Sequence, residues 1–254
     1  MAVSGVNSID YYYTAVSTGK KINSASDDAA GLAISEKLTS QINGINKGTQ
    51  NALDAQSLLK TAEGSLNTIT DSLQRIRELA LQASNSFYTL SDKKNIQNEI
   101  DELKSHISDT VNTANFNTKN LFDRNNDSFY FATSADGSGQ TVSLGGALLQ
   151  SLGIADFDVT KAFNINDIDS ALDTVSSITS GLGASYNRFE YTIESNLNSS
   201  LNLQAANSRI MDTDMGEYVS EMKKTEVLEY YTLYMQKKAQ ETNGNMTLKL
   251  LNTI

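Results

Sequence analysis

The strongest constraint on the fold is an apolar stripe between residues 38 and 83, in which apolar side chains recur at helical spacing. Its members are Leu38, Ile42, Ile45, Ala52, Leu59, Ala62, Leu66, Ile69, Leu73, Ile76, Ala80 and Ala83. Steps of three and four residues, or of seven, are typical of a helix that packs along other helices. The chain contains no proline, the residue that kinks a helix interior. The pattern therefore predicts one continuous helix over 28–86.

The ends and the weakest point of this helix can also be predicted. Ser26 is the expected N-cap, and Asp27 and Asp28 place negative charge at the positive end of the helix dipole. Gly44 and Gly48 each cost up to about 1 kcal/mol in a helix interior. A break in the helix, if there is one, is expected at these two glycines.

Three further helices follow in the sequence. One begins with a start signal at Ser91–Asp92 and continues to Val111, another covers 165–201, and the last begins near Asp214. The apolar stripe of the helix that begins at Ser91 contains Ile96, Ile100, Leu103, Ile107 and Val111. The stripe of the helix at 165–201 contains Ile165, Ile168, Leu172, Val175, Ile178, Leu182, Tyr186, Phe189, Ile193, Leu197 and Leu201. The pattern breaks at 86–91, so the first two helices are expected to fold back as neighbours.

One region has the period of a β-hairpin. Phe129, Phe131 and Thr133 alternate with other residues, Asp136–Gly137 supplies a turn, and Thr141–Leu144 alternates back. The stretch 145–160 is expected to be an irregular apolar cover. The predicted fold is therefore mainly α: an elongated antiparallel helical bundle or coiled coil with one small β-hairpin region.

Composition excludes several functions. A net charge of −10 opposes binding to a phosphate backbone or an anionic membrane surface, so neither nucleic acid nor membrane is expected as a partner. The absence of cysteine removes disulfides, thiolate nucleophiles and thiolate zinc sites. The N-terminus has no basic and apolar regions typical of a cleaved secretory signal, and no apolar run is long enough to span a bilayer.

No catalytic or metal-binding group emerges from the sequence. His106 is the one histidine, and it is expected on a helix surface. The pairs Asp27–Asp28 and Glu99–Glu102 are interpreted as helix-dipole partners and a solvated face. Asp123–Asp127 begins like a calcium loop, but lacks the glycine and the glutamate that such a loop needs. The chain is therefore predicted to be no enzyme, and to use no metal or other cofactor.

Several strings resemble bacterial flagellins. They are Gly19–Gly31 (GKKINSASDDAAG), Thr61–Leu66, Leu73–Leu79 (LQRIREL), Asn95–Ile100, Phe116–Asn117, Leu182–Phe189 and Ser208–Asp214 (SRIMDTD). These strings cover nearly the whole chain in the order found in that family.

The resemblance implies a structural subunit that polymerises with itself into the bacterial flagellar filament and serves motility. It implies a discontinuous terminal coiled-coil domain, residues 1–26 with 212–254, and a rod domain, residues 27–211, with the hairpin near 128–145. It also implies export, without a cleaved peptide, through the flagellar export apparatus with a chaperone, and a secreted, extracellular filament. The variable outer domains of the family look absent, and fewer residues than usual precede the Asp27–Gly31 string.

The resemblance further implies a contact for the mammalian Toll-like flagellin receptor. Arg75, Leu79 and Glu99 occupy the matching positions. The same residues are alternatively contacts between subunits in the filament.

Two tyrosine clusters carry a separate prediction about the terminal helices. Tyr11, Tyr12 and Tyr13 precede the rod domain at a distance similar to that at which Tyr230, Tyr231 and Tyr234 follow it. In an antiparallel pair of terminal helices the two clusters should therefore meet. The last residues, with Leu248, Leu250 and Leu251, are then expected to lack an intramolecular partner, to be disordered in the monomer and to pack on neighbouring subunits.

Two alternatives to a major filament subunit remain open from the sequence. One is a hook–filament junction protein, which shares the terminal helices. The other is a minor flagellin that co-assembles in a mixed filament. An enzyme inserted in a flagellin scaffold is disfavoured because the chain has no His-Glu-x-x-His motif.

Overall fold

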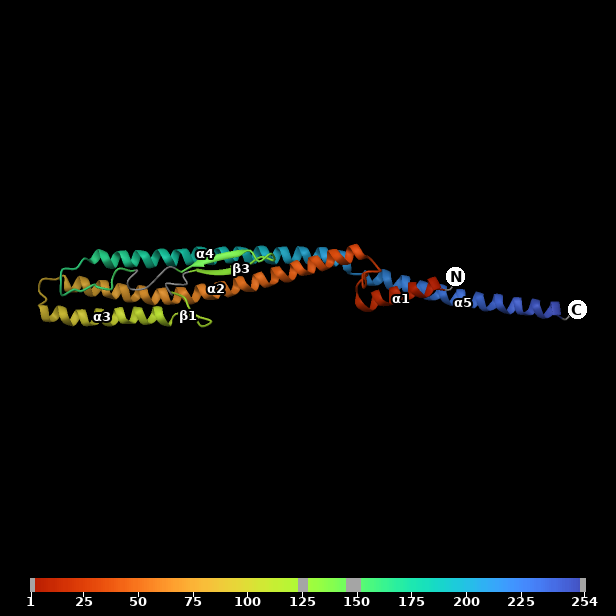
Figure 1. Ribbon diagram of the computed structural model, residues 1–254, viewed down its shortest axis with the longest axis horizontal. Coiled ribbons are helices and arrows are strands. Elements are labelled where there is room, and N and C mark those ends of the chain that lie inside the picture. Colours follow the sequence, from red (N-terminus) through yellow and green to blue (C-terminus); the bar gives the residue numbers. More distant parts are fainter. Residues whose placement is uncertain (1–2, 123–127, 145–151, 252–254) are drawn as a thin grey trace. The chain divides into compact units, whose positions relative to one another are not determined.

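The computed structural model describes residues 3–122, 128–144 and 152–251, and the side chains of 9–122, 128–144 and 152–246. The described elements are α1 (Val3–Thr18), α2 (Ala29–Ala83), α3 (Leu90–Thr113), β1 (Asn115–Phe116), β2 (Lys119–Asn120), β3 (Ser128–Ala132), β4 (Gly139–Ser143), α4 (Ile165–Met211) and α5 (Met215–Leu251). The fold is mainly α, as predicted, with two small antiparallel strand pairs (Figure 1).

The chain divides into two compact units. The terminal unit consists of Met1–Ile42 and Leu201–Ile254, and the central unit of Asn43–Ser200. The helices α2 and α4 each contribute residues to both units.

The apolar stripe of α2 forms the core of the central unit. From Ala52 to Ala83 its members are at most 2% exposed, and they pack against apolar residues of α3, α4 and the hairpin. Within this unit the three helices lie side by side (Figure 1). The stripe predicted on α4 is buried or partly buried as far as Ile193, but Leu197 is 52% exposed and Leu201 is 63% exposed. The prediction of buried contacts at Leu197 and Leu201 was therefore wrong.

The starts of two helices differ from the prediction by a few residues. Asp28, not Ser26, caps α2, because its carboxylate accepts a hydrogen bond from the Gly31 backbone N–H at 2.9 Å. Ser26 instead bonds the Ser24 hydroxyl. At α3, Thr89 and Asp92 form a capping box, in which each side chain bonds the other's backbone N–H.

The predicted continuity of α2 is confirmed across Gly44 and Gly48. The tip of the β3–β4 hairpin lies directly against these glycines. A Cβ atom at Gly48 would overlap the carbonyl of Thr133, and one at Gly44 would lie 2.8 Å from the Cβ of Ala135. The two residues that most weaken the helix thus provide the space in which the hairpin docks.

Asparagines of two helices hold the hairpin in this position. Asn51 of α2 donates to the Ala132 carbonyl at 2.8 Å, and Asn196 of α4 donates to the Thr133 carbonyl at 2.9 Å. The strands pair antiparallel with Tyr130 opposite Thr141, and Gly137 takes a positive φ of 83° in the turn. The predicted hairpin is therefore confirmed.

Two short segments after α3 complete the central unit. The tight β1–β2 hairpin was not predicted; it turns at Asn117 and Thr118, both with positive φ. The described part of the predicted apolar cover, 152–160, packs on the core through Leu152, Ile154, Phe157 and Val159. Gln97 of α3 holds it by accepting from the Val159 N–H at 2.8 Å and donating to the Phe157 carbonyl.

The terminal unit is built on α1 and α5, which pack on one another. An isolated antiparallel bridge joins Lys20 to Asp212 where the chain enters and leaves the longer helices. Its buried apolar side chains, among those described, are Ala15, Ile22 and Met211. This core is small, and most of the apolar surface of α5 has no cover within the unit.

The disorder expected for the end of the chain is not seen, because α5 continues to Leu251. The side chains of Leu248, Leu250 and Leu251 lie outside the described residues. Among the described helices none has an apolar stretch that would cross a membrane.

Candidate functional site

The first candidate surface lies on α2 and α3 of the central unit. The guanidinium of Arg75 donates to one carboxylate oxygen of Glu99 through Nε at 3.0 Å and through Nη2 at 2.8 Å. Its Nη1 also donates to Glu78 at 3.1 Å. Glu99 and Glu78 raise the pKa of Arg75 above its usual value by hydrogen bonding and by charge. This is a solvated ionic cluster, since the Arg75 and Glu99 side chains are 51% and 47% exposed.

Leu79 was expected at the same surface, but it is only 2% exposed and belongs to the core. The helix explains the difference. Leu79 follows Ile76 by three residues and precedes Ala80 by one, so it lies beside the buried stripe, whereas Arg75 and Glu78 lie on the outer side. The accessible residues of this surface are therefore Arg75, Glu78 and Glu99.

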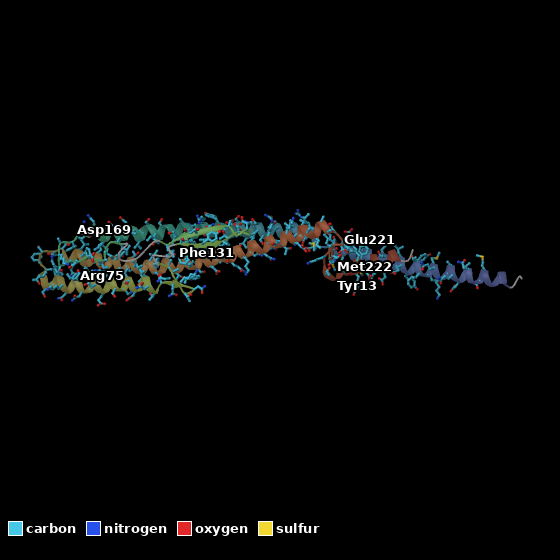
Figure 2. The ribbon with its side chains drawn as sticks, in the orientation of Figure 1. Tyr13, Arg75, Phe131, Asp169, Glu221 and Met222 are labelled. Carbon is cyan, nitrogen blue, oxygen red and sulfur yellow. The ribbon has the colours of Figure 1, made fainter. Side chains whose placement is uncertain are left out.

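A second exposed ion pair joins α2 to α4. Arg77 of α2 donates to Asp169 of α4 at 2.6 Å, and both side chains are more than 40% exposed. Arg75 and Asp169 both lie toward the end of the central unit that carries the α2–α3 turn (Figure 2). Arg75 and Arg77 thus join α2 to two different helices.

The tyrosines of α1 do not meet the cluster on α5 that the sequence predicted. Tyr11 and Tyr12 pack on Tyr218, with ring centroids 6.2 and 5.7 Å apart. The Tyr11 hydroxyl lies 3.4 Å from that of Tyr218 and donates to the Lys21 carbonyl at 3.1 Å. The hydrogen bond with Tyr218 and burial raise the pKa of Tyr11 to about 12.

The register error has a specific cause. The prediction counted from Asp27 and Met211, which assumed that all residues between α1 and α2 advance along the helix pair. In the structure α1 ends at Thr18, Gly19 follows with a positive φ of 71°, and Lys20 pairs with Asp212, so the residues between Gly19 and Asp28 do not extend the helix pair. The ring that Tyr11 meets is that of Tyr218, six residues after Asp212, and not one of the tyrosines at 230–234. The glycine of the Gly19–Lys20 pair was the sequence signal for a helix end at this point.

The other tyrosines of the two predicted clusters, which do not pack on Tyr218, are exposed. Tyr13 of α1 is 67% exposed, and Tyr230 of α5 is 76% exposed. Tyr231 and Tyr234 are also exposed, as is every residue from Tyr230 to Met246. The second half of α5 therefore presents an apolar surface without a partner in the described part of the terminal unit.

His106 remains the one candidate for acid–base chemistry. It is exposed on α3, and its Nδ1 lies 3.3 Å from the Ser72 hydroxyl. That hydroxyl donates to the Thr68 carbonyl, and within the described residues no carboxylate bonds the imidazole. No three metal-ligating side chains cluster in the described ranges. The calcium-like segment 123–127 lies outside them.

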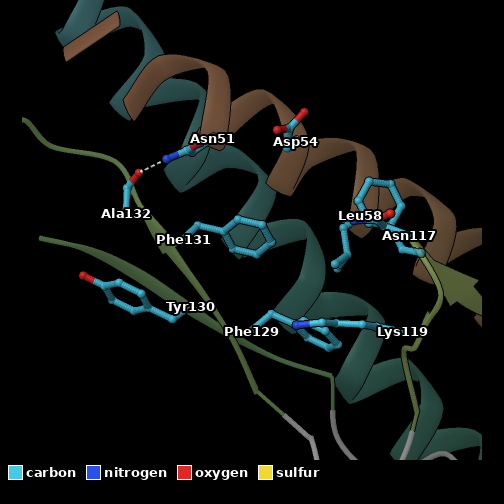
Figure 3. A pocket seen from close by; sticks show the side chains of 10 residues that line it. Asn51, Asp54, Leu58, Asn117, Lys119, Phe129, Tyr130, Phe131 and Ala132 are labelled. Atoms are coloured by element: carbon cyan, nitrogen blue, oxygen red, sulfur yellow. Dashed lines mark hydrogen bonds between the residues drawn. The ribbon is translucent and has the colours of Figure 1, made fainter. Parts of the chain in front are cut away.

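An apolar pocket of about 590 Å³ opens between α2, the β1–β2 hairpin and β3. Leu58, Phe129 and Phe131 contribute apolar side chains to it, while Asp54 and Lys119 are charged residues of its lining (Figure 3). No pattern in the sequence indicates this pocket, because its walls come from segments whose contact depends on the tight turn at Asn117.

Comparison with known proteins assigns both ends of the chain to related profiles. The profile for the bacterial flagellin N-terminal helical region matches residues 3–127. The profile for the bacterial flagellin C-terminal helical region matches residues 165–251. All five described helices lie within these two matched regions.

Individual relatives agree with this assignment. A flagellin of Halalkalibacterium halodurans is 41% identical over 221 residues, 84% of this chain and 81% of the relative. The flagellar filament 33 kDa core protein of Treponema phagedenis is 35% identical over 234 residues, 84% of this chain and 82% of the relative. The crystal structure of Bacillus cereus flagellin matches with a TM-score of 0.52 and 23% identity, over 58% of this chain and 88% of that one. The last likeness shows the fold alone.

Proposed function

This chain belongs to the bacterial flagellin family, and on that premise we propose how it acts as a structural subunit of the flagellar filament. The observation that carries this function is the match of both terminal helical regions to the family, together with filament proteins similar over most of their length. The chain polymerises with itself. Because the family is structural, we infer that it acts without catalysis.

The domain organisation that we propose follows the breaks in the helices. Residues 1–26 with 212–254 form the terminal coiled-coil domain, and residues 27–211 form the rod domain with its hairpin near 128–145. Two features support these boundaries: α4 ends at Met211, and the backbone bonds from Lys21 to Met211 and from Thr213 to Gly19 lie at the same level.

Residues 227–246 of α5 form the surface that we assign to contacts between terminal domains. Val227, Leu228, Tyr231 and Met235 are all more than half exposed. Apolar side chains at positions i, i+1, i+4 and i+8 lie within an arc of about 100°, the usual width of a stripe by which a helix packs on another helix. In a self-assembling chain, the helices of other copies are the partners that bury this arc.

Secretion and host recognition are proposed on the family relation. The chain reaches the extracellular filament through the flagellar export apparatus, with a chaperone. Its fold contains no disulfide, because the chain has no cysteine. The solvated cluster of Arg75 and Glu99 is the contact for the mammalian Toll-like flagellin receptor. Because Arg75 is half exposed in the monomer, a receptor can reach it before polymerisation.

Electron microscopy of the purified chain after polymerisation tests the function. Long helical tubes are expected from a filament subunit. Short capped stubs would point to a hook–filament junction protein instead, and a chain that enters tubes only together with a second flagellin would be a minor subunit. A chain that stays monomeric in every mixture would contradict the filament function.

A further inference from the structure

The side chain of Phe87, called the knob below, is exposed on the turn between α2 and α3. Phe87 is 89% exposed, more than any other large hydrophobic side chain in the described residues. Leu90, at the start of α3, is 60% exposed and lies three residues away. Full exposure of an aromatic ring to water is unfavourable, and such side chains are enriched at protein interfaces.

The turn holds this knob in a fixed position. The Phe87 N–H donates to the Asn85 side chain at 3.1 Å, and the Tyr88 N–H donates to the Asn85 carbonyl at 3.2 Å. Tyr88, the next residue, packs on the core and its hydroxyl accepts from Gln82 at 2.9 Å. Since Tyr88 is anchored inward, Phe87 points outward from an ordered turn. Binding through this side chain therefore costs little additional ordering.

The apolar pocket at β3 has the complementary character. Its volume of about 590 Å³ is in the range of pockets that hold a large side chain or a small ligand. Phe131 of its lining is fixed by an edge-on contact with Phe189, at a centroid distance of 5.8 Å. At one end, the hydrogen bond from Asn51 to the Ala132 carbonyl ties β3 to α2 (Figure 3). The pocket is thus preformed.

The knob cannot enter the pocket of its own chain. Leu58, in the pocket, and Ala83, the last residue of α2 before the knob, belong to one uninterrupted helix. At 1.5 Å per residue they are separated by roughly 38 Å. Because both features belong to the central unit, their separation is fixed within each copy.

Charged groups beside the two features would orient their contact, because the pocket lining has an anion, Asp54, and a cation, Lys119, at different places. Lys94, in the second turn of α3 beyond the knob, is exposed and has no ion pair within the described part of the chain. Asp54 of the pocket lining is also exposed and likewise has no ion pair there. An attraction between these two groups would orient the knob at the pocket.

We propose that Phe87 of one copy inserts into the β3 pocket of the next copy, as a contact between central units in the filament. The proposal rests on the self-polymerisation proposed above and names one of its contacts. A knob and a pocket at different places on the same unit make a heterologous contact, which repeats into an open assembly rather than closing into a dimer. Successive copies joined in this way would be displaced along α2 by roughly 40 Å.

Cysteine cross-linking tests the contact directly, because the native chain has no cysteine. The double variant Phe87→Cys/Lys119→Cys is assembled into filaments together with wild-type chains and then oxidised. We expect dimers and larger products that a thiol reductant reverses. Each single-cysteine variant, and the control pair Tyr191→Cys/Lys119→Cys, should give no ladder; Tyr191 is 71% exposed, on α4. Filaments that contain the double variant but no cross-links would overturn the contact, as would a cross-link within the dilute monomer.

If the double variant does not enter filaments, the critical concentration for assembly of single alanine variants tests the same contact. Phe87→Ala should raise the critical concentration for assembly about tenfold or more, as expected for an interface anchor. Tyr191→Ala should change it less than about twofold, since scattered exposed residues contribute little. Equal assembly of Phe87→Ala and wild-type chains would overturn the contact while leaving the filament function intact. If wild-type chains form no filaments under any condition, the filament function itself fails, and the contact with it.

Discussion

Arg75 and Glu99 join α2 to α3 through two hydrogen bonds to a single carboxylate oxygen, at 3.0 and 2.8 Å. The pair is on the surface, where ion pairs contribute little to stability because water and salt screen them. The pair orders a guanidinium and a carboxylate side by side on two helices, and we propose that this arrangement serves recognition. The sequence resemblance had indicated Arg75 and Glu99 as contact residues, and their accessibility is compatible with this.

Arg75→Ala should leave the monomer folded, with an unchanged far-ultraviolet circular dichroism spectrum and melting temperature. Signalling through the receptor by the monomer should fall about fivefold or more, as expected for loss of an interface arginine. Arg77→Ala is the matched control, because it breaks a similar exposed ion pair, with Asp169. Unchanged signalling by the Arg75 variant would exclude this site. Leu79→Ala is unsuitable as a test, since truncating a buried leucine costs about 2–5 kcal/mol.

Alanine at two glycines of α2 should change stability in opposite directions. Gly64 has no neighbouring atom within 4 Å of an added Cβ, so Gly64→Ala should stabilise the chain by up to about 1 kcal/mol. At Gly48 the added Cβ would overlap the Thr133 carbonyl, so Gly48→Ala should destabilise the chain by displacing the hairpin. Urea unfolding measures both effects. Stabilisation by both substitutions would contradict the docking of the hairpin at Gly48.

The packing of α1 on α5 should weaken in alkali. The pKa of Tyr11 is raised to about 12 from an ordinary value of 10.0, so the fold favours the neutral phenol. The resulting stabilisation is complete below pH 10 and is lost as the pH rises toward 12. Tyr11→Phe should flatten this loss, because it removes the bonds to Lys21 and Tyr218.

The absorbance of tyrosinate and the circular dichroism of the helices, followed over the same pH range, measure this effect. Tyr13→Phe is the control, because Tyr13 is exposed. The assignment would be wrong if the Tyr11 and Tyr13 variants titrated alike.

Gln97→Ala should loosen the segment 152–160 from α3. The substitution leaves the Val159 N–H without its acceptor, whereas the Phe157 carbonyl keeps a hydrogen bond from Lys104 at 3.4 Å. Leaving a buried polar group unpaired costs about 1–3 kcal/mol. Amide hydrogen exchange at Val159 should accelerate, while Asn98→Ala, an exposed neighbour, should have no such effect. Equal exchange in both variants would show that apolar contacts alone hold the segment.

The sequence by itself determined the elements that depend on local pattern. The heptad spacing from Ala52 to Ala83 predicted the buried face of α2, because apolar residues three and four apart fall on one side of any helix. The alternation around Phe129 and the Asp136–Gly137 turn predicted the hairpin for the same kind of reason. The family strings, which are also local, predicted the filament function.

Relations between distant segments were decided only by the tertiary structure. Leu79 lies within a helix whose pattern is clear, yet the packing of neighbouring helices determines that it is buried. The meeting of Tyr11 with Tyr218 depends on how the chain turns at Gly19, and a shift of that turn changes every partner along α1 and α5. The pocket at β3 needs the turn at Asn117 to bring β2 near α2. Periodicity determines which side of a helix is apolar, but it does not determine which residues of two helices lie opposite one another. That register is set by the turns and by the side chains that meet across the helices.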